Sequence, residues 1–408
     1  MKIRSLLLGS VFVAGMATTG YAADLGVVTS LDVCDELGLS GLTISSDDNC
    51  LVITGGVSMS YSIGDYEGNS NNFLHFQRDH NDDDFNYANG GTDSDLDIDA
   101  WLKFVASAPS DFGPATATIK LLGDSWNGNG NLNVVVDEAW VGIGDTTVIM
   151  AGKKSSIFNK GDDAPLNYLG LFHSDDIDPG VGFRDGVGTG NAVIQVVSNL
   201  GNGLSIGGGI ENLDSSANIT AVGVLSYAGD GITAHISGAV DESSVWNVHA
   251  GFTGAWDPIK VVGAVAADSS GWWNVLGSVS ATFDMFTLAA SGEATSESEW
   301  GVGGSATATV SEGVTINLGG RYFDATGTID GFSASQVEAG VSAAVTETIT
   351  ATAAVGYKST TADGGYSVIY GKGGLAWAPG GGFTSSVEGY VDNFGSYKAT
   401  FKAAKEIK

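Results

Sequence analysis

The chain has no long apolar run after its first residues, and this absence restricts its class. No later stretch approaches the roughly 18 consecutive apolar residues that a membrane-spanning helix needs. Helical patterns of Leu, Glu and Lys are missing, and only 6 of the 408 residues are proline. Apolar residues make up 43% of the chain but stand singly, whereas a large soluble core needs continuous buried runs. A helical membrane protein is therefore excluded, and a large soluble domain is disfavoured.

Cationic residues are also scarce. The 17 lysines and arginines stand against 47 aspartates and glutamates, which gives a formal net charge of −30 at pH 7. Since nucleic-acid binding depends on lysine and arginine contacts to phosphates, a nucleic-acid partner is excluded. Acidic loops at an outer surface would hold divalent cations and repel other anions.

There are two cysteines, Cys34 and Cys50. In an oxidising compartment the simplest expectation is a disulfide between them, which would close a loop of about 15 residues and contribute about 3 kcal/mol. The alternative is a pair of free thiols.

The first residues resemble a secretory signal. Lys2 and Arg4 precede an apolar core at residues 6–17, and small residues suited to cleavage follow. The apolar core is too short for a membrane anchor. We expect a signal peptide at residues 1–22 with cleavage after Ala22; cleavage one residue later is the alternative.

The stretch 51–63 alternates strictly between two kinds of side chain. One phase carries Val57 and Met59, and the other carries Ser58 and Ser60. Successive side chains of a strand point to opposite faces, so one face is apolar and the other is small and polar. The stretch is about long enough to cross a bilayer at a tilt. This pattern is typical of a transmembrane strand between lipid and water.

Similar stretches recur along most of the chain, and their raw count is 20; since short strands are easily over-counted, 16 and 18 are the alternatives. Early candidates are 51–63, 97–106, 115–122, 133–143 and 147–152. Later candidates begin near Ala192, Leu204, Ile219, Ile232, Trp246, Ile259, Trp273, Phe286, Gly301, Val314, Val337, Ile349, Ser367, Phe383 and Tyr397. An even number suits a bacterial barrel with both ends on the periplasmic side.

The connections alternate between tight turns and longer acidic loops. Tight turns are expected at 200–203, 228–231, 257–258, 311–313 and 379–382, and longer loops at 212–218, 241–244, 268–271, 296–299, 324–335 and 359–365. Two loops are much longer, at 65–94 and 154–190. Short turns on one side and long loops on the other are typical of outer-membrane barrels.

These patterns predict an all-β fold, a closed antiparallel transmembrane β-barrel with a water-filled interior. The barrel domain is expected at residues 50–408, and residues 23–49 are expected to form a segment without strands that is pinned by the cysteine pair. A calcium-binding Gly/Asp solenoid is a rival for a glycine-rich chain, but its nine-residue repeat is not found.

The alternation also assigns charged residues to a face. On the strand from Val314, the apolar residues Val314 and Ile316 share one phase, which sends Arg321 to the other. Four lysines take the polar phase of their strands in the same way: Lys103, Lys120, Lys260 and Lys398. A cation on the lipid face would cost about 2–4 kcal/mol near the bilayer midplane, so these residues favour a watery lumen. A soluble sandwich explains the phase equally well, but it needs bulky interdigitating side chains where this chain has mostly Ala, Val and Ile.

The long loop at 154–190 is acidic. Its candidate pore-constriction residues are Asp162, Asp163, Asp175, Asp176 and Asp178. If the loop folded into the barrel, these carboxylates would face the wall lysines and Arg321, and opposed charges across a narrow opening would sort solutes by size and charge. The alternative is a solvated external loop.

No residues point to an enzyme, a cofactor or a metal. The run 93–99 resembles a calcium loop, but Ile98 and Phe104 occupy the positions where an EF-hand needs Gly and Glu. The five histidines have no metal-binding spacing, and no nucleophile elbow or phosphate-binding loop is found.

Two segments resemble a known family. V-C-D-E-L-G-L from Val33 and D-N-C-L-V-I-T-G-G-V from Asp48 resemble the N-terminus of alphaproteobacterial general porins of the Rhizobiales type. D-E-A-W-V-G-I-G from Asp137, with the stretch through Phe158, resembles the strands that enter the third loop of that family.

The resemblance implies a homotrimeric channel in the bacterial outer membrane, among lipid and lipopolysaccharide, that passes small hydrophilic solutes. It implies 16 strands and an inward-folded loop at 154–190 that narrows the pore. We therefore expect a general diffusion porin with a mild preference for cations. A substrate-specific channel and a structural or adhesive surface barrel are the alternatives.

Overall fold

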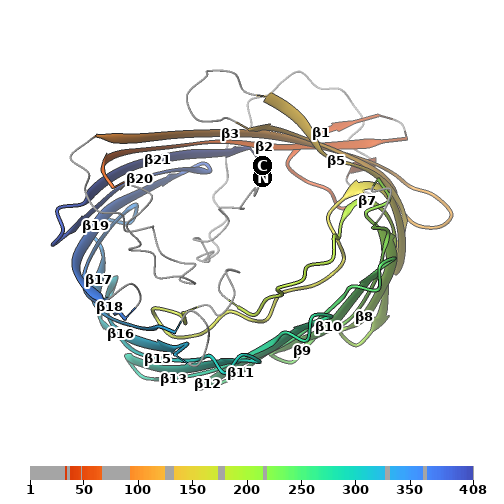
Figure 1. The fold of residues 1–408 in the computed structure, drawn as a ribbon. Helices are drawn as coiled ribbons and strands as arrows, with labels where there is room; N and C mark the ends of the chain where they lie inside the picture. Colours follow the sequence, from red (N-terminus) through yellow and green to blue (C-terminus); the bar gives the residue numbers. More distant parts are fainter. Residues whose placement is uncertain are drawn as a thin grey trace.

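The chain forms a closed antiparallel barrel around an open interior (Figure 1). The computed structural model describes residues 33–34, 37–46, 48–66, 92–124, 133–172, 180–214, 218–326, 331–361 and 365–407. The expected signal peptide lies outside these residues. The strands are β1 (Leu42–Ser45), β2 (Cys50–Asp65), β3 (Asp93–Ala108), β4 (Ala115–Asp124), β5 (Asn133–Gly144), β6 (Thr147–Lys154), β7 (Asn191–Gly201), β8 (Leu204–Glu211), β9 (Thr220–Gly229), β10 (Ile232–Asp241), β11 (Trp246–Trp256), β12 (Ile259–Asp268), β13 (Trp273–Phe283), β14 (Phe286–Thr295), β15 (Trp300–Ser311), β16 (Val314–Asp324), β17 (Ser333–Ala344), β18 (Ile349–Thr360), β19 (Tyr366–Gly380), β20 (Phe383–Asp392) and β21 (Tyr397–Ile407).

From β2 onward, each strand pairs antiparallel with the next, and β21 pairs back with β2. The closing ladder runs from Gly55 opposite Ile407 to Asp65 opposite Tyr397. All but β1 of the 21 strands in the sheet belong to this ring, which therefore has 20 strands. Closure removes the unpaired strand edges that would otherwise face lipid. The count from the sequence is confirmed, and the 16 strands implied by the family resemblance are too few for this chain.

The alternation of side chains between lipid and lumen is confirmed on individual strands. On β10, Ile236 and Val240 are 52% and 44% exposed on the outer face, while His235 and Ser237 are buried on the inner face. Branched apolar residues at alternate positions suit a pleated strand whose outer face meets hydrocarbon.

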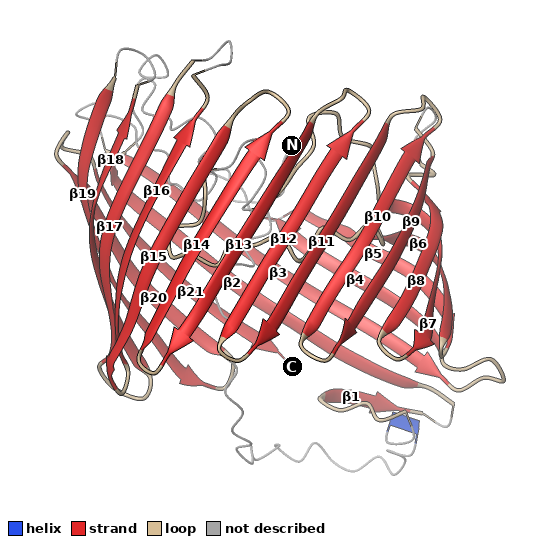
Figure 2. Cartoon of the chain, turned by 90° about the horizontal axis from the view of Figure 1, so that it is seen from below, coloured by secondary structure: helices blue, strands red, loops and turns tan. Residues whose placement is uncertain are grey.

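The two rims differ as expected, and Figure 2 shows the tilted strands joined by turns at both ends. Between β7 and β8, Asn202 and Gly203 both have positive φ, and between β9 and β10 the same holds for Asp230 and Gly231. Positive φ at both central residues is the pattern of the type I′ turn, which matches the twist of a hairpin. The longer connections, among them the one between β6 and β7, all open at the opposite rim.

The strand β1 corrects one prediction, because residues 23–49 were expected to contain no strand. β1 pairs with residues 50–53 of β2, at the end of β2 that the ladder with β21 does not reach. Its apolar alternation covers only Leu42 and Ile44, which is too short to be recognised in the sequence. The predicted disulfide between Cys34 and Cys50 is confirmed, and it ties this segment to the start of β2.

Most other predicted strand starts coincide with the observed ones or differ by one residue. β3 begins at Asp93 and not at 97. Its first lumen-facing positions are acidic, among them Asp95 opposite Ser62, so the sequence alone indicated a polar loop there. β17 begins at Ser333 and not at Val337, since its first outward positions carry serine and give no apolar signal. In the part of the chain that the structure describes, no helix is long and apolar enough to span a membrane.

Candidate functional site

The loop between β6 and β7 lies against the inner face of the barrel wall (Figure 1). Its first limb, residues 155–172, runs across the strands from β8 to β17. Backbone N–H groups of this limb donate hydrogen bonds to inner-face side chains: Ile157 to Glu211 (3.1 Å), Asn159 to Ser237 (3.0 Å), Leu166 to Ser278 (2.9 Å) and Tyr168 to Ser305 (3.0 Å). An irregular loop has no ladder partner, so wall hydroxyls and carboxylates satisfy its amides.

The return limb, residues 180–190, passes back over the same strands. Its N–H groups bond to Asn274, Asp268, Asn247 and Glu211 in turn: Gly182 at 3.2 Å, Arg184 at 2.8 Å, Val187 at 2.7 Å and Gly190 at 2.6 Å. Glu211 thus holds both ends of the loop, since it accepts from Ile157 and from Gly190. Residues 173–179, including Asp175, Asp176 and Asp178, lie outside the described residues.

Two of the predicted acidic residues, Asp162 and Asp163, lie against histidines of the wall, and Asp162 is hydrogen-bonded to its histidine. Asp162 Oδ2 lies 3.2 Å from His235 Nδ1, and Asp163 Oδ2 lies 3.5 Å from His249 Nε2. Asp162 also accepts a hydrogen bond from Thr233. Burial raises the pKa of Asp162, but hydrogen bonds from Thr233, His235 and Thr253 outweigh it and hold that pKa below its ordinary value.

Glycines on the inner face make room for the first limb. At each of four positions, a Cβ atom would lie less than 3.0 Å from the loop: Gly251 (carbonyl O of Gly161), Gly303 (Nδ2 of Asn167), Gly319 (Cγ of Leu169) and Gly340 (Oη of Tyr168). A side chain at these places would therefore push the loop away from the wall.

Small apolar clusters fill the space between loop and wall. Leu171 and Val181 of the loop pack with Val262, Ala264 and Leu276 of β12 and β13. A second cluster joins Phe172 to the wall residues Phe323 and Phe332. The inner face is therefore not polar throughout, as the alternation had suggested, because the loop covers part of it and needs an apolar surface to pack against.

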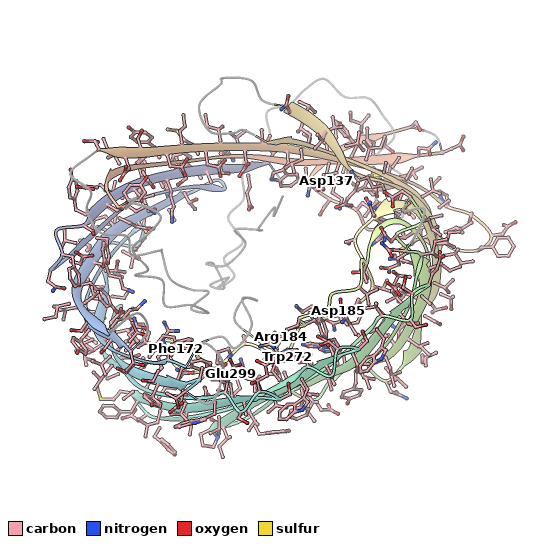
Figure 3. All side chains as sticks on the ribbon, in the orientation of Figure 1. Asp137, Phe172, Arg184, Asp185, Trp272 and Glu299 are labelled. Atoms are coloured by element: carbon pink, nitrogen blue, oxygen red, sulfur yellow. A yellow bond between two sulfur atoms is a disulfide. The ribbon has the colours of Figure 1, made fainter. Side chains whose placement is uncertain are left out.

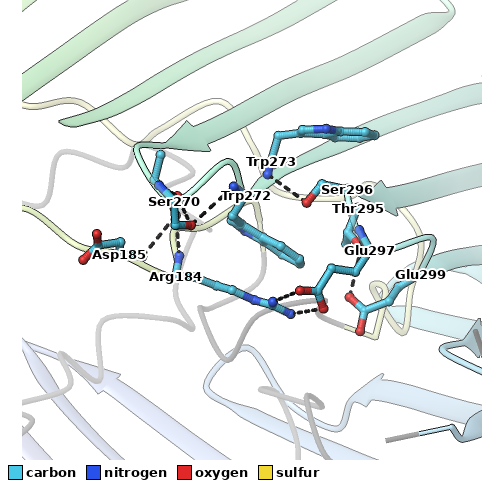
Figure 4. A network of polar contacts seen from close by, with 10 residues as sticks. Arg184, Asp185, Ser270, Trp272, Trp273, Thr295, Ser296, Glu297 and Glu299 are labelled. Carbon is cyan, nitrogen blue, oxygen red and sulfur yellow. Dashed lines mark hydrogen bonds and ion pairs between the residues drawn. The ribbon is translucent and has the colours of Figure 1, made fainter. Parts of the chain in front are cut away.

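Arg184 fixes the return limb near the long-loop rim (Figure 4). Its guanidinium lies 3.9 Å from the ring centroid of Trp272 and forms a two-point ion pair with Glu297. The backbone N–H of Arg184 bonds to Asp268, so three contacts, two at the β12–β13 connection and one at the β14–β15 connection, hold this one residue. Figure 3 shows Arg184, Trp272 and Phe172 inside the ring.

Tyr168 anchors the far end of the first limb. Its hydroxyl donates to Glu338 Oε1 at 2.6 Å, and Tyr370 donates to the other oxygen of this carboxylate at 2.6 Å. Lys372 Nζ lies 2.9 Å from the same carboxylate, whose side chain is fully buried. Burial and the bond to Glu338 raise the pKa of Tyr168 far above its ordinary value, so the hydroxyl stays a donor.

The predicted lumen-facing bases Lys103 and Lys120 are paired with acids of β5. These lysines are direct cross-strand neighbours, which would be repulsive without compensation. Lys103 lies 3.1 Å from Glu138, and Lys120 lies 2.6 Å from Asp137. A β-bulge at Asp137 brings both acids opposite one stretch of β4, and the group of four side chains has no net charge.

Two further predicted bases, Arg321 and Lys260, differ in their surroundings. Arg321 is buried: its Nη1 bonds to the carbonyl of Leu171 at 3.1 Å, and its Nε bonds to Gln336 at 2.7 Å. It therefore holds the loop through the backbone carbonyl of Leu171. Lys260 is exposed near the short turn at 257–258, on the same face of β12 as the buried Val262.

The sequence analysis missed the histidine pair, the inner-face glycines and Glu211. Alternation with the outward Ile236 puts His235 on the inner face, but nothing local indicated that His249 of the next strand would touch it. Glu211 and Glu338 lie on the polar phase of their strands. This local signal could have marked both as inward-facing acids, which the structure shows to be buried. Among the described residues, no three His, Cys, Asp or Glu side chains are grouped so that they could hold a metal ion.

Comparison with known proteins places the chain in a family. Residues 27–372 match the family model of the porin subfamily. Similar solved structures include the outer membrane channel DcaP of Acinetobacter baumannii (14% identity, TM-score 0.38, covering 90% of this chain and 100% of that one) and the anion-selective porin from Comamonas acidovorans (13%, 0.42, 88% and 100%). A mutant of the Rh. blastica porin is similar as well (11%, 0.40, 87% and 99%). No curated protein matches the sequence significantly. With a family match over most of its length and a closed barrel of 20 strands, the chain belongs to the porin subfamily and is a bacterial outer-membrane porin.

Proposed function

We propose that the loop at 155–190 narrows the water-filled lumen and thereby limits the size of the solutes that diffuse through it. The observation that carries this proposal is the path of the first limb, which is bonded to the inner wall from Glu211 on β8 to Glu338 on β17. A loop held along that much of the wall reduces the open cross-section. The transport is passive and involves no catalytic step or cofactor.

We further propose a mild preference for cations. The chain carries a formal charge of −30, and the described lysines of the wall do little to offset it, since several are paired with acids. Such pairs are Lys103 with Glu138, Lys120 with Asp137, Lys372 with Glu338 and Lys402 with Glu388. Excess carboxylates at the loop rim would raise the local concentration of cations.

The test is a planar-bilayer recording of the purified protein in a KCl gradient. We expect stepwise openings and a reversal potential with the sign of cation selectivity. Replacing the loop acids, Asp162→Asn with Asp163→Asn or Asp175→Asn with Asp176→Asn, should shift the reversal potential toward zero if they face the pore. Asp284→Asn, in a short turn at the other rim, is the matched control and should shift it less. An anion-selective potential contradicts the proposed preference, and silence in the bilayer contradicts the channel itself.

The assembly and the finer family assignment are proposals as well. A homotrimer embedded in lipid and lipopolysaccharide is supported by the family, and the Cys34–Cys50 disulfide is consistent with the Rhizobiales-type framework. Light scattering of the detergent-solubilised protein tests the trimer. N-terminal sequencing of protein purified from outer membranes tests the expected cleavage after Ala22.

A further inference from the structure

A cavity of about 330 Å³ lies between the loop residue Tyr168 and the inner wall formed by β16 to β21. Tyr168 is the loop residue in its lining, so the cavity is bounded by the loop on one side and by wall strands on the other. Its volume is at the lower end of the range for small-molecule sites, which suits a small solute.

Three charged side chains line this cavity, and strand register sets their spacing. Lys372 of β19 pairs directly with Tyr390 of β20, which pairs directly with Lys398 of β21. The two lysines are thus separated by two strand spacings, about 10 Å between Cα atoms. Glu388 lies two residues from Tyr390 along β20, about 7 Å away and on the same face. The cavity therefore presents two ammonium groups and one carboxylate around Tyr390.

Lys372 and Glu388 are held in place yet remain accessible. Lys372 bonds to Glu338, whose charge is also satisfied by Tyr168 and Tyr370, and its own side chain is 50% exposed. Glu388 is 52% exposed and lies 3.2 Å from Lys402. An ammonium group has three donors and a carboxylate has about four acceptor sites, so both groups can bind a further partner.

The rest of the lining combines aromatic rings with uncharged polar side chains, namely Asn317, Ser342, Thr352 and Thr400. The hydroxyls of Tyr168 and Tyr390 bond to Glu338 and Asp392, which leaves their rings as the surface offered to the cavity. Ala354 of β18 adds a small apolar side chain on the inner face. This part of the cavity suits a short hydrocarbon side chain.

We propose that this cavity is a subsite for a small zwitterion of the α-amino acid type, with its carboxylate toward Lys372 and Lys398 and its ammonium group toward Glu388. The proposal rests on the channel function above and adds a solute class to it. A simple anion would leave Glu388 facing like charge, and a simple amine would lie beside two ammonium groups. A zwitterion matches both signs and has no net charge that the acidic channel would repel.

The test measures initial uptake rates into proteoliposomes that contain the full-length porin. The probes share one carbon skeleton: L-leucine, isocaproate, which lacks the ammonium group, and isoamylamine, which lacks the carboxylate. We expect uptake of L-leucine to saturate with concentration, while uptake of the other two rises linearly. Glu388→Gln and Lys398→Gln should each raise the half-saturating concentration of L-leucine by about tenfold, which corresponds to about 1.4 kcal/mol.

The control variant is Glu347→Gln, which makes the same chemical change in an exposed short turn outside the cavity and should leave the half-saturating concentration unchanged. Linear uptake of L-leucine overturns the subsite, and so does saturation by isocaproate at the same concentration, which would indicate an anion site. Single-channel conductance in KCl separates these results from failure of the porin function: a conducting protein without saturation loses only the subsite.

Discussion

The Nε2 atom of His235 lies 2.8 Å from the Nδ1 atom of His249, and the two imidazole rings stack with centroids 5.0 Å apart. Both side chains are fully buried, and they come from neighbouring strands, β10 and β11. Asp162 and Asp163 of the loop lie at the two ends of this pair. The hydrogen bond from this pair to Asp162 and its 3.5 Å approach to Asp163 therefore connect the loop to the wall.

Removing one histidine should loosen the loop. His249→Ala leaves the Nε2 atom of His235 without its ring partner and Asp163 without the nearby imidazole, at a cost of about 1–3 kcal/mol for the buried group. We expect more open-channel current noise and faster protease cleavage within 155–190. Val248→Ala, at the outward-facing neighbour, should change neither. Equal noise in the two variants would show that the histidine pair does not hold the loop.

The Asp162 anchor should depend on pH. Its pKa in the folded protein lies below the ordinary value of 3.8, so folding favours the ionised form. The resulting stabilisation is fully present above pH 3.8 and is lost as the pH falls through the lowered pKa. Current noise recorded as the pH is lowered through this range should rise in the native channel. Asp162→Asn should already be noisy at neutral pH, with a smaller further increase; an unchanged acid response in this variant would assign the effect to another group.

The inner-face glycines should be intolerant of side chains. In Gly303→Ala the new Cβ would lie 2.6 Å from Asn167 Nδ2 and 3.0 Å from the carbonyl of Gly170, so the loop must move. We expect a change in single-channel conductance with the barrel still folded, as judged by its heat-modifiable migration in gels. Gly277→Ala has no atom within 4 Å of the added carbon and serves as the matched control. Native conductance in Gly303→Ala would mean that the loop tolerates displacement without affecting the pore.

The disulfide should stabilise β1 and leave the ring largely unaffected. In the Cys34→Ser/Cys50→Ser variant, the chain-entropy model predicts a loss of about 3 kcal/mol for a loop of this size. Hydrogen exchange should accelerate at residues 42–45 and 50–53, where β1 pairs with β2. Residues 55–65, paired with β21, should exchange slowly in both proteins. Failure of the variant to form a barrel would show that the disulfide is needed for assembly.

The sequence predicted the barrel because its decisive signal is local. Whether a strand side chain meets lipid or water depends only on its parity along the strand, so residues such as Ile236 and His235 could be assigned to faces without a structure. Turn residues such as Asn202 and Asp230 marked the short connections, since they tolerate positive φ. Prediction was weakest where lumen-facing acids or outward serines interrupted the pattern, at Asp93 and Ser333.

Only the tertiary structure decided which residues meet across the lumen. The wall partners of Asp162, Asp163 and Tyr168 lie 71 or more residues away in sequence, on strands whose register and curvature bring them to the loop. The alternation of side chains along a strand predicts that His249 and Glu338 point inward, but it does not predict which loop atom each one contacts. The same holds for Gly303 and Gly340, because the lack of a side chain at these positions matters only where the loop packs against them. Local chemistry thus determined the wall, while long-range packing determined how the loop is held inside it.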